Sequence, residues 1–83
     1  MMKNNIMIRV YILSLSIEKE FQIPDTFTVE ESIDAVINLL LQEYPSLKVK
    51  ESLDFYIENN GFLDRKMQLK QVIQHPSERT YLL

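Results

Sequence analysis

The sequence predicts one α+β domain in which a mixed sheet of four or five strands packs on one main helix and a short 3₁₀ helix. Alternating apolar and polar residues open and close the chain, and this alternation is typical of strands that bury one face. Between these segments, apolar residues recur with the period of an α-helix. The chain has 83 residues, which is enough for one hydrophobic core and too few for two domains.

The composition excludes several classes of function. Apolar residues make up 46% of the chain and charged residues 25%, as in folded proteins. Cysteine is absent, which excludes disulfides and thiolate chemistry and makes a cytoplasmic location the default. The formal net charge is −3 and the basic residues are scattered, so we expect no nucleic acid partner. No apolar run approaches the roughly 18 residues of a membrane span, so we expect no direct membrane insertion.

A hairpin opens the predicted fold. Residues 6–13 alternate so that Arg9 and Tyr11 face away from the core, and residues 19–23 resume the alternation before Pro24 stops it. The connection has no glycine or asparagine, so a loop of about four residues is expected. We expect residues 1–83 to form a single domain, with residues 1–5 disordered.

The main helix follows the hairpin. Thr28 and Glu31 have the spacing of a capping box, which marks a helix start, and Pro45 marks its end. Leu39 lies off the apolar stripe, so it is either a contact residue or a stray surface leucine. The stripe that should face the sheet contains Val29, Ile33, Val36, Ile37, Leu40 and Tyr44.

The second half of the chain returns to strands. Residues 53–57 form a predicted strand with Tyr56 pointing outward, and Asn60-Gly61 fits a type I′ turn that leads into a short strand at residues 62–63. A short 3₁₀ helix is predicted around residues 67–73.

The chain closes with a last strand. It is predicted at residues 79–83, after a turn at residues 75–78. A terminal strand that follows two crossovers lies most economically parallel to the first strand, between it and the third. This order is the β-grasp arrangement.

The chain resembles ubiquitin-like proteins from Met7 to Leu83. The features that carry the resemblance are the opening hairpin, the turn before the helix, Pro45 after it, the Gly61 turn and the terminal strand. Within this group it looks most like the EsaB/YukD-type accessory proteins of type VII secretion systems. The shared elements are Phe21-Gln22-Ile23-Pro24, the spacing of Leu63 and Leu69, and the Leu82-Leu83 ending, whereas the usual Gly-Asp turn before the last strand is replaced by residues 75–78. The resemblance implies a cytosolic, non-enzymatic component that acts through protein contacts.

No residues are predicted to be catalytic, and no cofactor or metal is expected. The single histidine, His75, lies next to a proline in a predicted turn and reads as a surface group. Sulfur carriers and conjugated modifiers of the ubiquitin superfamily need a slender Gly-Gly end, whereas this sequence ends in Tyr81-Leu82-Leu83, so that role is disfavoured. A small regulatory subunit of an enzyme complex is a further alternative.

Binding through a surface remains as the predicted activity. Tyr11, Tyr56 and Tyr81 should all point away from the helix on neighbouring strands, and Arg9 and Leu39 are further candidates for contact. We expect the partners to be other proteins bound to the outer sheet face. The competing interpretation, given equal weight, is that the tyrosines only stabilise a half-exposed sheet through cross-strand pairs. The oligomeric state is not predicted.

Overall fold

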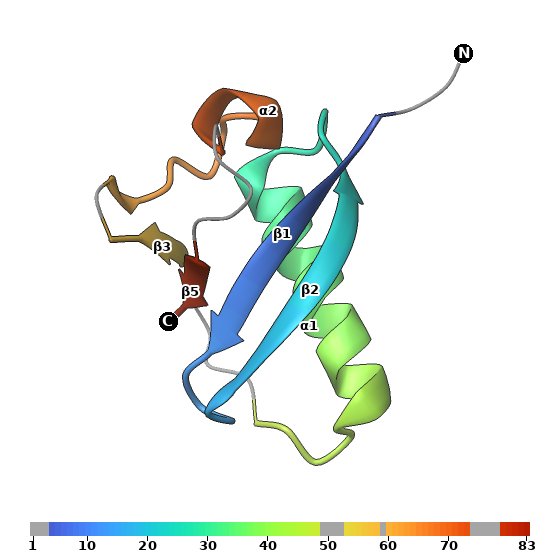
Figure 1. Cartoon of the computed structure of the whole chain (residues 1–83). Coiled ribbons are helices and arrows are strands. Elements are labelled where there is room, and N and C mark those ends of the chain that lie inside the picture. The colour runs from blue at the N-terminus through green and yellow to red at the C-terminus, as the bar shows by residue number, and fades with distance from the viewer. Residues whose placement is uncertain (1–3, 49–52, 59, 74–78) are drawn as a thin grey trace.

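The computed structural model describes residues 4–48, 53–58, 60–73 and 79–83, and it shows a five-stranded mixed sheet packed on one main helix (Figure 1). The elements in chain order are β1 (Asn5–Ile12), β2 (Ile17–Pro24), α1 (Val29–Glu43), β3 (Phe55–Ile57), β4 (Gly61–Phe62), α2 (Leu69–Val72) and β5 (Arg79–Leu82). The expected turn at residues 75–78, with His75, lies outside the described residues.

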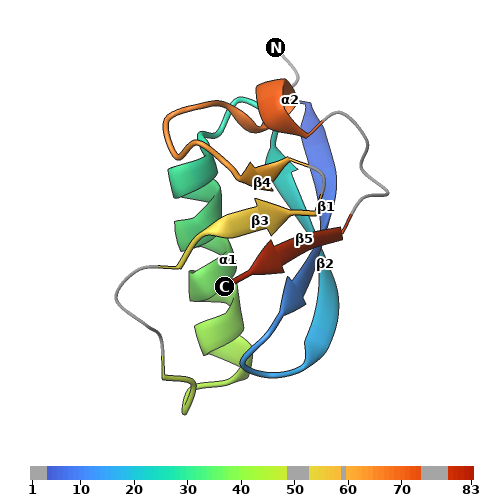
Figure 2. The ribbon, with the colours of Figure 1, turned by 90° about the vertical axis from the view of Figure 1, so that its left-hand side faces the viewer.

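The sheet has the strand order β2-β1-β5-β3-β4. β5 runs parallel to β1 and antiparallel to β3, while β1–β2 and β3–β4 are antiparallel hairpins. In Figure 2, α1 runs along one face of the sheet, and β3, β4 and β5 lie nearer the viewer than β1 and β2. Asp54 and Leu83 exchange backbone hydrogen bonds of 3.0 and 3.1 Å, which extend the β3–β5 pairing at one end. The predicted β-grasp order is confirmed.

The first hairpin matches its prediction in loop length and differs at its start. Four residues, 13–16, connect β1 and β2, and Ser16 adopts a positive φ of 54°. β1 begins at Asn5, and the carbonyl of Asn4 accepts a 3.0 Å hydrogen bond from the Asp25 amide. The disorder expected for residues 1–5 is therefore wrong for Asn4 and Asn5, because β2 and the turn after it supply backbone partners.

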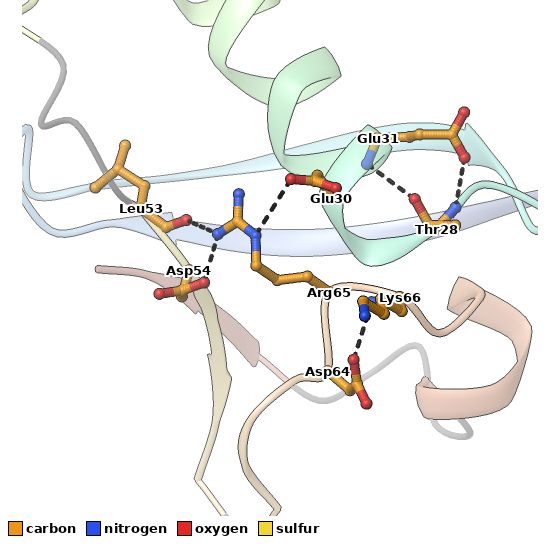
Figure 3. A network of polar contacts seen from close by, with 8 residues as sticks. All are labelled: Thr28, Glu30, Glu31, Leu53, Asp54, Asp64, Arg65 and Lys66. Carbon is orange, nitrogen blue, oxygen red and sulfur yellow. Dashed lines mark hydrogen bonds and ion pairs between the residues drawn. The ribbon is translucent and has the colours of Figure 1, made fainter.

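The predicted capping box starts α1. Thr28 Oγ1 accepts a hydrogen bond from the Glu31 amide at 3.1 Å, and Glu31 Oε1 accepts one from the Thr28 amide at 2.9 Å (Figure 3). Each side chain thus satisfies a backbone donor that the helix itself cannot pair. The helix ends as predicted, because Tyr44 forms its C-cap and Pro45 cannot continue the hydrogen-bond ladder.

The core lies between α1 and the inner face of the sheet. Every strand except β4 contributes buried apolar side chains, and Phe55 is the largest side chain that is fully buried. Two polar side chains are buried with it, and the hydroxyl of Ser32 donates to the Thr28 carbonyl at 2.8 Å. The core comprises Ile8, Val10, Ile12, Phe21, Ile23, Val29, Ile33, Val36, Leu40, Phe55, Ile57, Leu63, Leu69, Ile73 and Leu82.

The turn between β3 and β4 differs from the predicted type I′ turn. Ile57 pairs with Gly61 and its carbonyl accepts a 2.9 Å hydrogen bond from the Asn60 amide, so three residues rather than two separate the paired positions. Gly61 has a φ of 75°, as in hairpins that combine a type I turn with a bulge glycine. The longer loop shifts the register, with the result that Phe62 faces outward opposite Tyr56 and Leu63 faces the core.

The loop before α2 covers the start of α1. The amides of Val29 and Glu30 donate to the carbonyls of Met67 and Arg65 at 2.8 and 3.1 Å, so the loop satisfies donors at the helix N-terminus. The expected short helix is α2, which combines an i→i+3 bond from Gln71 with an i→i+4 bond from Ile73.

Arg65 joins three segments at this end of the molecule (Figure 3). Its Nη1 donates to Asp54 Oδ1 at 2.6 Å and to the Leu53 carbonyl at 2.9 Å, and its Nε lies 3.6 Å from Glu30 Oε1. The hydrogen bond to Asp54 is the main cause of the raised pKa of Arg65, so the guanidinium is a permanent positive charge. The segment before β3, the first turn of α1 and the loop before α2 are thereby held together.

We predict that Gly61→Ala lowers the free energy of unfolding by about 1 kcal/mol, because an L-residue with a side chain is strained at positive φ. A Cβ there would meet nothing within 4 Å, so the loss reflects the backbone conformation and not a clash. Gly61→Asn is the matched control and should lose less, because asparagine tolerates this conformation better. Urea unfolding measures both, and equal losses would contradict the explanation.

A second prediction concerns Arg65. Arg65→Met keeps an unbranched apolar stem but removes the contacts to Asp54, Leu53 and Glu30, and should lower the urea midpoint of unfolding. Lys66→Met makes the same change of charge on the neighbouring exposed side chain and should leave the midpoint nearly unchanged. Equal effects of the two substitutions would show that Arg65 does not hold the segments together.

Candidate protein-interaction surface

The sheet turns a continuous outer face away from α1. Because side chains alternate along each strand, the neighbours of every buried core residue point to this face. From one edge to the other it carries Glu18, Glu20 and Gln22 on β2, Met7, Arg9 and Tyr11 on β1, Arg79 and Tyr81 on β5, Tyr56 on β3 and Phe62 on β4.

Four aromatic side chains form a strip across this face, which we call the aromatic strip: Tyr11, Tyr81, Tyr56 and Phe62. The Tyr11 and Tyr81 ring centroids lie 5.8 Å apart, those of Tyr81 and Tyr56 lie 6.4 Å apart, and those of Tyr56 and Phe62 lie 5.2 Å apart. The outer pairs are edge-to-face, the arrangement favoured by the ring quadrupoles. The structure therefore brings the three predicted tyrosines together and adds a fourth ring.

Phe62 is the most exposed member of the aromatic strip, with 63% of its surface accessible. Sequence reasoning missed it because a two-residue turn at Asn60-Gly61 would have turned Phe62 toward the core. The glycine that signals the turn was visible, but the loop length that decides the register was not.

Arg79 lies over the end of the aromatic strip on β1 and β5. Its guanidinium carbon is 5.5 Å from the Tyr11 ring centroid and 5.9 Å from that of Tyr81, and its Nε donates to Glu18 Oε1 at 2.7 Å. Its interactions with the Tyr81 side chain and then with Glu18 raise its pKa, so its charge is fixed. Arg79 was not predicted as a site residue, although its spacing of two from Tyr81 placed it on the same face.

Arg9 lies beside Arg79 on this face. The two residues are register partners in the parallel β1–β5 pair, and Glu20 is the partner of Arg9 on β2. Within the described part of the chain, Arg9 forms no ion pair. The structure thus brings Arg9 to the aromatic strip, whereas Leu39 is exposed on α1, on the other side of the sheet.

An apolar pocket of about 140 Å³ lies at the end of the molecule where α1 and β1 finish. Its lining is almost entirely aliphatic, with Ser14 and Lys48 as its polar members. Across residues 4–48, 53–58, 60–73 and 79–83, no group of three or more His, Cys, Asp or Glu side chains is placed to hold a metal ion. In that same part of the chain, neither helix has the length and apolar content of a membrane span.

Comparison with known proteins supports the fold. No protein-family model matches the chain, and no curated protein matches it in sequence. Among solved structures, the EccD5 ubiquitin-like domain from Mycobacterium xenopi has a TM-score of 0.72 at 11% identity, covering 96% of this chain and 93% of that one. The fold is ubiquitin-like.

Two further structures support this assignment of the ubiquitin-like fold. The ubiquitin-like domain of the Mycobacterium tuberculosis type VII secretion system protein EccD1 has a TM-score of 0.65 at 15% identity, covering 93% of this chain and 97% of that one. A chain described under "Molecular Mimicry of SUMO promotes DNA repair" has a TM-score of 0.69 at 18% identity, covering 100% and 94%. These identities show a shared fold, so the function must be argued from the surface.

We predict that the ring contacts of the aromatic strip stabilise the sheet. In a double-mutant cycle of Tyr11→Leu and Tyr81→Leu, the coupling free energy of unfolding should be about 0.5 to 1 kcal/mol, because the rings are in edge-to-face contact. Tyr11 and Tyr56 are separated by β5 and form the control pair, for which the coupling should be near zero. Equal couplings in the two cycles, measured by urea unfolding, would contradict a direct ring contact.

Proposed function

We propose that this chain is a non-enzymatic ubiquitin-like module that binds another protein through the outer sheet face. The single observation that carries the proposal is the aromatic strip, four contiguous rings that cross four strands and are solvent-accessible. Aromatic residues are enriched where protein surfaces associate, since they bury a large area and lose few rotamers.

The arrangement of the aromatic strip favours binding in a second way. Each ring already rests against a neighbour, and Arg79 is held over two of them by Glu18. Side chains that are fixed before association lose less conformational entropy on binding. Preorganised rings with hydroxyl groups at their tips suit a surface that is hydrated in the free protein and buried in a complex.

We further propose that the module works in the cytoplasm as an accessory or regulatory component of type VII secretion. The structural likeness of 93% of the chain to the ubiquitin-like domain of a type VII secretion protein supports this context, together with the resemblance of the sequence to EsaB/YukD-type proteins. The neighbouring genes provide a test, because genes for a secretion ATPase and small helical substrates should lie beside this one.

The binding face is tested by quantitative affinity purification from the native cell. The triple substitution Tyr11→Ala, Tyr56→Ala and Tyr81→Ala should reduce recovery of the specific partner by roughly 10- to 100-fold, as expected when several central aromatic contacts are removed. Leu39→Ala is the matched control, since it removes an exposed apolar side chain from α1 on the other side of the sheet.

Circular dichroism and urea unfolding establish that each variant is folded before binding is compared. Full retention of the partners by a folded triple variant would show that the outer sheet face is not the binding surface. Loss of the partners with Leu39→Ala alone would move the site to α1.

A further inference from the structure

We propose that the bound partner presents a segment in which an aspartate or glutamate carboxylate stands close to an aromatic or aliphatic side chain. The carboxylate binds Arg9, and the apolar side chain lies on the aromatic strip beside Tyr11 and Tyr81. This inference rests on the proposed function, because it names the chemistry of the partner for the same face.

Two arginines lie side by side at the end of the aromatic strip. Arg9 and Arg79 are register partners on neighbouring parallel strands, so their Cα atoms are separated by about one strand spacing, roughly 4.8 Å. Both side chains point outward, as the burial of Val10 and Thr80 on the opposite face requires. Two guanidinium groups are therefore concentrated at one place on a chain whose net charge is −3.

The two arginines differ in the contacts that their guanidinium groups make within the domain. Arg79 donates to Glu18 at 2.7 Å and lies over two tyrosine rings, so its guanidinium already has partners within the sheet. Arg9 is half-buried and, among the described residues, has no carboxylate within ion-pairing distance, although its register partner Glu20 lies on the adjacent strand. Arg9 is consequently the arginine of this pair that forms no ion pair among the described residues, and its guanidinium is the one that can meet a carboxylate from a partner in competition with Glu20.

A carboxylate next to an apolar group fits this arrangement. A guanidinium binds a carboxylate through two parallel hydrogen bonds, and exclusion of water by apolar groups beside the pair strengthens the attraction. Arg9 and Tyr11 stand on the same face two residues apart, which separates them by about 7 Å along the strand. Side chains at i and i+2 of an extended segment, or about one turn apart on a helix, span a similar distance.

Selection from a display library of short random peptides tests the inference on the intact folded chain. The enriched peptides should contain an Asp or Glu within about four residues of an aromatic or long aliphatic residue, several-fold more often than the starting library. In fluorescence anisotropy titrations of these peptides, Arg9→Glu should weaken binding by about ten-fold or more. The affinity for the original chain should also fall as NaCl rises, because the pair lies at the edge of the aromatic strip.

Matched variants distinguish the effect of the charge at Arg9 from the effect of the net charge of the chain. Lys70→Glu makes the same change of net charge on the exposed face of α2, outside the sheet, and should alter the affinity less than two-fold. Arg9→Lys keeps the charge but loses the planar fork, and should show an intermediate loss with the salt dependence retained. A nuclear magnetic resonance spectrum of each variant establishes that it is folded.

The outcomes distinguish this inference from the proposed function. If Tyr81→Ala abolishes peptide binding while Arg9→Glu does not change it, the acidic-partner inference is overturned and the binding face stands. If neither substitution weakens binding, both fail. If Arg9→Glu and Lys70→Glu weaken binding equally, or if no enriched peptide depends on Arg9, the inference is likewise overturned.

Discussion

The insertion of β5 between β1 and β3 is the contact on which the rest of the structure depends. It pairs the end of the chain in parallel with its beginning, and without it the two hairpins would be separate sheets. On the inner face it places Thr80 beside Val10 and Leu82 beside Ile12, which closes the core under α1. The two strands are distant in sequence, so bringing them together has a high entropic cost of loop closure. Burial of these side chains offsets that cost.

The same strand pairing creates the outer face. Side chains alternate between the two faces along β1 and β5. The register that pairs buried residues on the inner face therefore also pairs outward residues, so Tyr11 lies beside Tyr81 and Arg9 beside Arg79. Under the proposed function, stability and recognition depend on the same strand pairing. The two interpretations of the tyrosines are compatible, because ring contacts that stabilise the sheet would also hold the rings in place for the proposed partner.

The loop before α2 organises the end of the molecule where α1 begins. Its backbone caps the first turn of α1, and Arg65 connects that turn to the segment leading into β3. These contacts join the segment that leads into β3 to the first turn of α1.

Local sequence determined the types of the elements and the faces of most side chains. The capping box at Thr28, the stop at Pro45 and the outward direction of Tyr11, Tyr56 and Tyr81 follow from spacing within a few residues, because helix and strand periodicity are local properties.

Tertiary structure decided which side chains meet. Phe62 joined the aromatic strip only because the β3–β4 loop is one residue longer than the Asn60-Gly61 signal suggested, and a change of register exchanges the two faces of a strand. Arg79 and Arg65 found their partners on segments far away in the sequence, and such pairs depend on strand order and loop paths. Periodicity therefore showed that Tyr11, Tyr56 and Tyr81 face outward, while the pairing of β5 with both β1 and β3 decided that they form one surface.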